Sequence, residues 1–179
     1  SVRTREGLAY TAGSFLQTRV DYPGVFASYF FTKTPTTALA TRLVFDELDR
    51  IQKEPVTTDE LETIQNNLIE TFPRNFESKG AMLGIFMNDE RTDRPEGYWQ
   101  NYRDKVRSVT PEMVQQAANE YLHPEDAVIL VVGPWEEIKK GNSESEADPS
   151  RVATMDEFFD GKATRIPTRD PESLKPIEE

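Results

Sequence analysis

The pattern of apolar and polar positions in the first third of the chain predicts two strands followed by a helix. Residues 8–12 and 25–31 are short runs of apolar and small side chains, and the turn-forming segment Asp21–Gly24 lies between them. This arrangement is typical of an antiparallel pair. Thr34-Pro35 then favours a helix start, because it places a hydroxyl at the N-cap and a proline at the first helical position. The apolar stripe of this helix, which ends before Pro55, is Leu39, Leu43, Val44, Leu48 and Ile51.

Four more helices are predicted from capping residues and helical spacing. Thr57 and Glu60 have the spacing of a capping box, and the helix that follows continues to Phe72 before Pro73. The periodicity indicates further helices over 76–88, 98–106 and 110–121, the last of them introduced by Thr110-Pro111.

The sequence of residues 127–179 predicts one more strand, then a linker and a tail. Residues 127–132 are wholly apolar, as in a strand at the centre of a sheet that helices cover on one side. The fold class expected is therefore α+β, an antiparallel-rich sheet with helices packed on one face. We divide the chain into a domain over 1–140, an acidic linker or loop over 141–150 and an extended tail over 151–179. The tail is expected to pack on the domain through its large apolar residues Met155, Phe158 and Phe159.

The charge, the length of the apolar runs and the cysteine content limit the kinds of molecule that the chain is expected to bind. The 179 residues carry 21 Lys and Arg against 32 Asp and Glu, a net charge of −11 without a basic cluster, which argues against nucleic acid. No apolar run approaches the roughly 18–20 residues of a membrane span, so no membrane partner is expected. The absence of cysteine removes disulfides and thiolate nucleophiles, and it leaves both reducing and oxidising compartments open.

Metal chemistry is limited by the single histidine. HExxH and its inversion HxxEH both need two histidines, so neither can be present. His123 stands beside Glu125 and Asp126, where it could act as a general base or one metal ligand, but a histidine at a helix end also stabilises the helix dipole. The acidic strings at 88–90 and 144–148 lack the spacing of a calcium loop and favour a solvated surface. We predict no metal or cofactor site in this chain.

The N-terminal string Arg3-Thr-Arg-Glu-Gly-Leu-Ala-Tyr10 is the remaining candidate for chemistry. The spacing by itself favours a simpler reading, in which Arg3 is an ordinary surface charge and Tyr10 is a tyrosine of the strand that follows. The string nevertheless resembles the motif of an arginine followed by Gly-Leu-Ala-Tyr in the second half of insulinase/pitrilysin zinc peptidases. Downstream pieces resemble that family in the same order: T-x-x-E-L at 57–61, F-E-S at 76–78, V-T-P-E at 109–112, A-A-N-E-Y-L at 117–122, V-V-G at 131–133 and the tail G-K-A-T-R-I-P-T-R-D-P-E-S-L-K-P at 161–176.

The resemblance implies an inverzincin of two related α+β halves that close like a clamshell around a peptide. In such enzymes the N-terminal half holds zinc through HxxEH and a distant glutamate. The C-terminal half has no metal and contributes an arginine and a tyrosine that hydrogen-bond substrate carbonyls; Arg3 and Tyr10 match these two residues. By this resemblance the chain is the C-terminal half of a bacterial-type member, without its first strand and helix, and a fragment of a longer protein.

The function expected is therefore substrate binding within a peptidase, with no catalysis by this chain alone. Its partners would be the zinc-bearing N-terminal half and a peptide, and the resemblance is compatible with a periplasmic or secreted parent. A second hypothesis is a non-catalytic interaction or scaffold subunit of the same family. A third is an unrelated α+β binding domain, which would be indicated if Arg3 and Tyr10 pointed away from any cleft.

Overall fold

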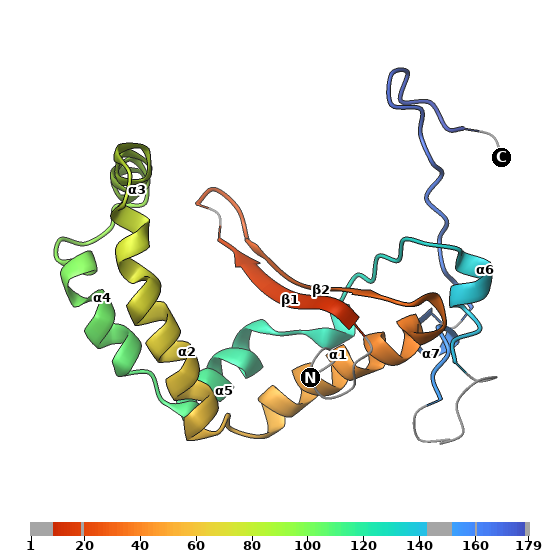
Figure 1. Ribbon diagram of the computed structural model, residues 1–179, viewed down its shortest axis with the longest axis horizontal. Coiled ribbons are helices and arrows are strands. Elements are labelled where there is room, and N and C mark those ends of the chain that lie inside the picture. Colours follow the sequence, from red (N-terminus) through yellow and green to blue (C-terminus); the bar gives the residue numbers. More distant parts are fainter. Residues whose placement is uncertain (1–8, 19, 143–151, 160, 178–179) are drawn as a thin grey trace.

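The computed structural model describes residues 9–18, 20–142, 152–159 and 161–177. A long hairpin of β1 (Ala9–Gln17) and β2 (Val25–Thr32) lies over helix α1 (Thr37–Lys53), as Figure 1 shows. The strands pair antiparallel, and Gln17 lies opposite Val25 where the turn begins. Gly24 is required at this turn, because a Cβ atom there would lie 2.0 Å from the carbonyl oxygen of Gln17. The hairpin with its helices confirms the α+β class.

Helix α1 begins later than the sequence predicts. Thr34-Pro35 opens a 3₁₀ turn, η1 (Thr34–Thr36), in which the Thr36 N–H donates to the carbonyl of Lys33. The α-helix itself starts at Thr37. Its buried Ala40 packs against Ala12 and Phe30, so the hairpin rests on α1 through one face of the sheet.

Three helices and a 3₁₀ turn form a separate limb of the molecule (Figure 1): α2 (Thr58–Thr71), η2 (Phe72–Phe76), α3 (Lys79–Arg91) and α4 (Tyr98–Arg107). The capping box of Thr57 and Glu60 is confirmed. The third helix, expected from residue 76, begins at Lys79, because the chain turns through η2 after Pro73 and Ser78 then caps the helix. On α2, Gln65 donates to the carbonyls of Val106 and Val109 and so holds the end of α4.

Helix α5 (Pro111–Tyr121) connects this limb to α1. Thr110 caps it as predicted, since its hydroxyl accepts from the Met113 N–H. The amide of Gln52 on α1 donates to the carbonyl of Leu122, and the Gln52 carbonyl accepts from Gln115. These bonds attach the end of α1 to α5.

The strand expected over 127–132 does not form. After the 3₁₀ turn η3 (Pro124–Asp126) this segment is extended, but the sheet of the described residues contains only β1 and β2. Val128, Leu130 and Val132 are exposed, whereas Val131 packs against the core. Apolar, β-branched residues favour an extended backbone, but a strand also needs a partner for its N–H and C=O groups. Among the described residues no segment supplies one.

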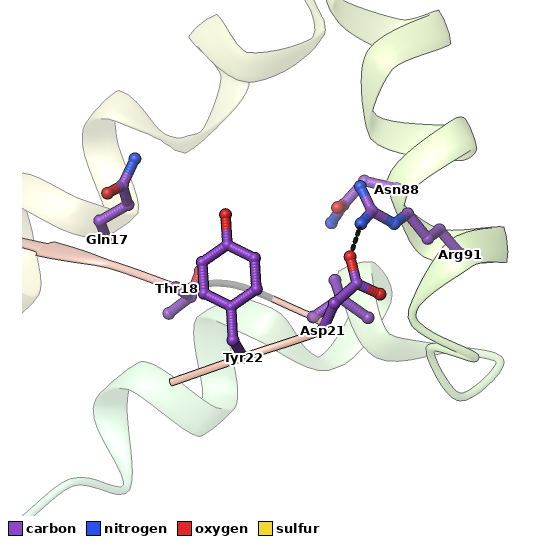
Figure 2. Close-up of a pocket in the computed structure, with 7 residues that line it drawn as sticks. Gln17, Thr18, Asp21, Tyr22, Asn88 and Arg91 are labelled. Atoms are coloured by element: carbon purple, nitrogen blue, oxygen red, sulfur yellow. Dashed lines mark hydrogen bonds and ion pairs between the residues drawn. The ribbon is translucent and has the colours of Figure 1, made fainter. Parts of the chain in front are cut away.

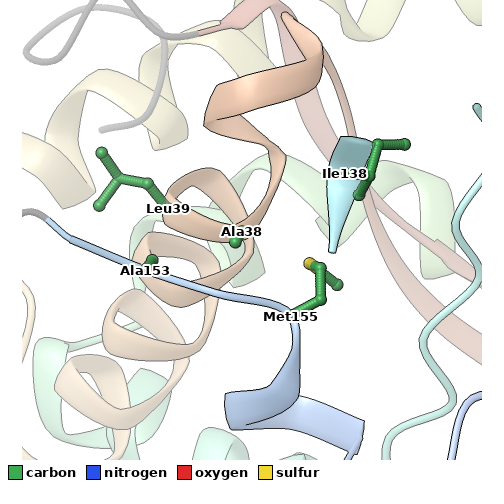
Figure 3. Close-up of a cluster of buried hydrophobic side chains, with 5 residues drawn as sticks. All are labelled: Ala38, Leu39, Ile138, Ala153 and Met155. Atoms are coloured by element: carbon green, nitrogen blue, oxygen red, sulfur yellow. The ribbon is translucent and has the colours of Figure 1, made fainter. Parts of the chain in front are cut away.

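The main core joins α1 to the C-terminal part of the chain. Figure 3 shows Ala38 and Leu39 of α1 with Ile138 of α6 (Trp135–Ile138), Ala153 and Met155. Met155 is fully buried, and it precedes the short helix α7 (Asp156–Phe159). Phe158 and Phe159 pack against this cluster, so the residues singled out in the tail do anchor the segment 152–159.

An ion pair ties the same segment to α1. Arg42 Nη2 lies 2.6 Å from Glu157 Oε1 and donates to the carbonyl of Val152. Partial burial raises the pKa of Glu157, but the hydrogen bonds from Arg42 and from the Thr154 N–H outweigh it, so the net pKa is lowered. The contribution of this pair to stability is therefore present at neutral pH and is lost as pH falls through that lowered pKa.

Beyond residue 160 the tail is exposed and extends away from the helices (Figure 1). Near its end the Ile177 N–H donates to the carbonyl of Thr168, and Asp170 Oδ1 accepts from the N–H and hydroxyl of Ser173.

Most of the linker expected over 141–150 lies outside the described residues, so the three-part division of the chain stays a prediction. Within the described residues no helix is long and apolar enough to cross a membrane.

Candidate functional site

Tyr10 stands at an irregularity of the hairpin. Ala9 lies opposite Thr32 and Thr11 lies opposite Phe31, so Tyr10 is the extra residue of a bulge in β1. A β-bulge bends its strand and changes the direction of a side chain. The Tyr10 side chain is 89% exposed. Its hydroxyl is therefore open to a partner from outside the described residues.

Arg3, the second residue of the predicted site, lies outside the described residues. The structure thus neither brings Arg3 and Tyr10 together nor separates them. Their shared role remains a prediction from the sequence motif.

The hairpin carries an aromatic surface that sequence reasoning did not identify. Ala12 and Phe30 face α1, and the strand alternation places Phe15, Tyr29 and Phe31 on the opposite face. We call these three residues the aromatic stripe. Its neighbouring rings, Phe15–Tyr29 and Tyr29–Phe31, each have centroids 6.4 Å apart, and all three side chains are exposed. The alternation in residues 25–31 contained this signal, but only the position of α1 shows which face stays uncovered.

Gly13 allows Tyr29 to lie across the sheet. The two residues are directly opposite each other, and a Cβ atom at Gly13 would lie 3.0 Å from the Tyr29 hydroxyl oxygen. The Tyr29 side chain therefore leans over β1 at Gly13. One aromatic residue of β2 thus reaches the other strand.

A polar pocket of about 260 Å³ lies between the hairpin turn and α3 (Figure 2). An ion pair between Asp21 and Arg91 joins its two sides. The rest of the lining consists of the amides and hydroxyls of Gln17, Thr18, Tyr22 and Asn88, together with the apolar Val20. The pocket contains no nucleophile with an adjacent base, so it supplies hydrogen-bonding groups and no evident covalent chemistry.

The other candidates from the sequence are His123 and the two acidic strings. His123 is exposed, and its Nδ1 lies 3.6 Å from Glu125 Oε1. Asp89 accepts from the Trp99 indole N–H at 2.5 Å and lies 3.2 Å from Arg94, so it holds the loop that joins α3 to α4. The acidic string at 144–148 is not described. Among the described residues, no group of three or more His, Cys, Asp or Glu could hold a metal ion.

We expect the isolated chain to bind no zinc tightly. A catalytic zinc site needs about three protein ligands, and His123 is the only imidazole. Metal analysis of the purified chain after dialysis against zinc and then buffer should find none retained, with the same result for His123→Ala. Retention of about one equivalent that is lost in His123→Ala would contradict this expectation.

The fold is α+β, and comparisons with known proteins agree with this class. Residues 1–68 match the family model of the peptidase M16 inactive domain. The chain is similar in fold to the peptidase M16 inactive domain from Pseudomonas fluorescens, with 23% identity, a TM-score of 0.61 and coverage of 68% of this chain and 29% of that one. It is also similar to a protease from Helicobacter pylori, with 20% identity, a TM-score of 0.58 and the same coverages. No curated protein matches the sequence.

Residues 1–68 are therefore similar to the peptidase M16 inactive domain. At such low identity the two structures establish the fold alone. The chain spans less than a third of the length of either one.

Proposed function

We propose that this chain is the zinc-free, substrate-binding half of an M16 metallopeptidase of the inverzincin type. In this proposal the zinc-bearing half belongs to the same protein and closes against the chain like a clamshell around a peptide. The chain does not catalyse hydrolysis by itself. Arg3 and Tyr10 contact carbonyl groups of the substrate from the side opposite the metal.

The observation that carries the proposal is the exposure of Tyr10 at the bulge of β1. A phenol hydroxyl can donate to a carbonyl oxygen and more strongly to the oxyanion that develops during peptide hydrolysis. An arginine can hold two peptide carbonyls at once, because its guanidinium is a planar fork of donors. The match of residues 1–68 to the M16 inactive domain covers both residues.

Substitution of Arg3 tests the proposal through substrate binding. In an enzyme assembled from this chain and the zinc-bearing half, Arg3→Ala should raise KM for a peptide more than it lowers kcat. The reason is that a donor to unreacted carbonyls binds ground state and transition state nearly alike. Arg3→Lys should restore little, since the forked geometry is lost.

Arg5→Ala is the matched control, because it removes the other arginine of the same string. The proposal fails if Arg3→Ala and Arg5→Ala give the same KM as the unsubstituted enzyme. If the assembled protein hydrolyses no peptide but still forms a stable complex, the chain is a scaffold subunit of the family instead.

A further inference from the structure

The bulge in β1 decides on which side of the sheet the Tyr10 side chain lies. Beyond the bulge the hairpin pairs regularly, and the same register extended by one residue would put Tyr10 opposite Thr32. Alternate residues of a strand share a face, so Tyr10 would then lie on the side of Ala12, which faces α1. The bulge instead pairs Ala9 with Thr32, and the Tyr10 side chain is 89% exposed.

The β2 residue beside the bulge is bonded to a second threonine. Thr32 Oγ1 lies 2.8 Å from Thr36 Oγ1 of the 3₁₀ turn η1, and both side chains are partly buried. The Thr36 hydroxyl donates to the carbonyl of Lys33 at 3.1 Å. Because a hydroxyl has one proton, Thr32 is the donor in the bond between the two threonines. We call Thr32 and Thr36 the threonine corner.

The threonine corner is attached to the core of the molecule. The Lys33 carbonyl also accepts from the Thr36 N–H at 3.0 Å and from the Thr37 hydroxyl at 3.3 Å, so the corner shares an acceptor with the first residue of α1. Residues 38–40, which follow in α1, are buried. A shift of β2 at Thr32 would therefore have to break the hydroxyl bond to a turn that the core holds in place.

We propose that Thr32 and Thr36 are positioning residues for Tyr10. Their hydroxyl bond lies on the α1 side of the sheet, at the place that the Tyr10 side chain would take in the regular register. The bond also holds the end of β2 against which the bulge forms. A bulge changes the direction of a side chain, and here it leaves the phenol open to solvent. Neither threonine contacts the substrate; both act through the backbone of the hairpin.

This inference rests on the proposed function, because the position of Tyr10 matters for hydrolysis only if Tyr10 contacts the substrate. A donor to a developing oxyanion works over a narrow range of distance, and a misplacement of about 1 Å can cost about a hundredfold in rate. Loss of the corner should therefore lower kcat through Tyr10. The contacts that Arg3 makes with unreacted carbonyls, and hence KM, should change little.

Valine substitutions test the role of the hydroxyl bond in the enzyme assembled from this chain and the zinc-bearing half. Thr32→Val and Thr36→Val should each lower kcat about tenfold with KM nearly unchanged, because valine keeps the shape of threonine without its hydroxyl. Thr32→Ser keeps the hydroxyl and should retain most of kcat. A role in packing alone predicts the opposite order, in which valine is tolerated and serine is not.

Thr71→Val is the matched control for these variants. The Thr71 hydroxyl donates to the carbonyl of Asn67 within α2, so the substitution removes the same group from a threonine outside the corner. It should leave kcat and KM unchanged. Equal losses of kcat in Thr71→Val and Thr32→Val would contradict the proposal.

Fluorine NMR of the purified chain reports on Tyr10 without any peptide hydrolysis. The chain is produced with 3-fluorotyrosine, and the Tyr10 resonance among those of the six tyrosines is assigned by its loss in Tyr10→Phe. Thr32→Val should shift or split this resonance, since the ring then also occupies the α1 side of the sheet. Thr32→Ser and Thr71→Val should leave the resonance in place.

A double-variant cycle separates positioning from an independent effect of the corner. In the Tyr10→Phe enzyme, Thr32→Val should lower kcat no further, because the hydroxyl that the corner positions is already absent. An unchanged Tyr10 resonance in Thr32→Val, or full additivity of the two substitutions in kcat, would overturn the inference. A shifted resonance together with full kcat in Tyr10→Phe would reject the role of Tyr10 in hydrolysis, while the corner would still place its side chain.

Discussion

Met155→Ala is expected to lower the free energy of unfolding by about 2–5 kcal/mol, which is the usual cost of removing a large apolar side chain from a core. Among the residues that the structure describes, Met155 is the largest side chain that is fully buried, and it lies among residues from α1, α6 and the segment 152–159. Since small domains have a total stability of about 5–15 kcal/mol, a loss at the upper end would unfold much of the population.

Urea denaturation followed by circular dichroism measures this effect. Met113→Ala is the matched control, because Met113 is 50% exposed and its truncation should change stability by less than about 0.5 kcal/mol. Equal midpoints for the two variants would show that the C-terminal segment does not belong to the cooperative core.

Tyr10→Phe should lower kcat for a peptide substrate by about a hundredfold in the assembled enzyme, while folding is unchanged. The substitution removes one hydroxyl from a side chain that is 89% exposed, so it creates no cavity and breaks no internal packing. A donor to a developing oxyanion acts mainly in the transition state. Its loss therefore lowers kcat and kcat/KM together, in contrast to the effect on KM expected for Arg3.

The control for this variant is Tyr121→Phe. Tyr121 is also exposed, and the hydrogen bond and negative charge of Glu120 raise the pKa of its phenol. It is the last residue of α5 and does not belong to β1, and its substitution should leave kcat unaffected. A kcat within about twofold of the unsubstituted enzyme for Tyr10→Phe would show that the tyrosine is structural.

The parts of the fold that depend on local chemistry could be predicted from the sequence. The capping residues Thr57, Glu60 and Thr110 satisfy N–H groups only a few residues away, so their pattern alone identifies helix starts. The apolar anchors of the tail were recognisable for a similar reason, since Met155 and Phe158 stand out in a polar segment.

The parts that depend on distant partners could not be predicted. Residues 127–132 have the composition of a central strand, but pairing requires a neighbour, and the described residues offer none. The bulge at Tyr10 is a shift in register between β1 and β2 and leaves no mark in the local sequence. The aromatic stripe depends on which face of the hairpin α1 covers. The motif therefore makes Tyr10 a candidate, and that role stays a prediction, but it says nothing of the surface beside it.

The core between α1 and the C-terminal segment has a consequence for synthesis of the protein. Arg42 and its partner Glu157 are separated by 115 residues, and the buried cluster around Met155 closes over a similar distance. At about 5–20 residues per second, a ribosome needs roughly 6–23 s to make that stretch after α1 has been translated. During this interval the apolar side of α1 has no cover from the C-terminal segment. The nascent chain therefore offers chaperones a binding site that disappears only when residues 152–159 have left the exit tunnel.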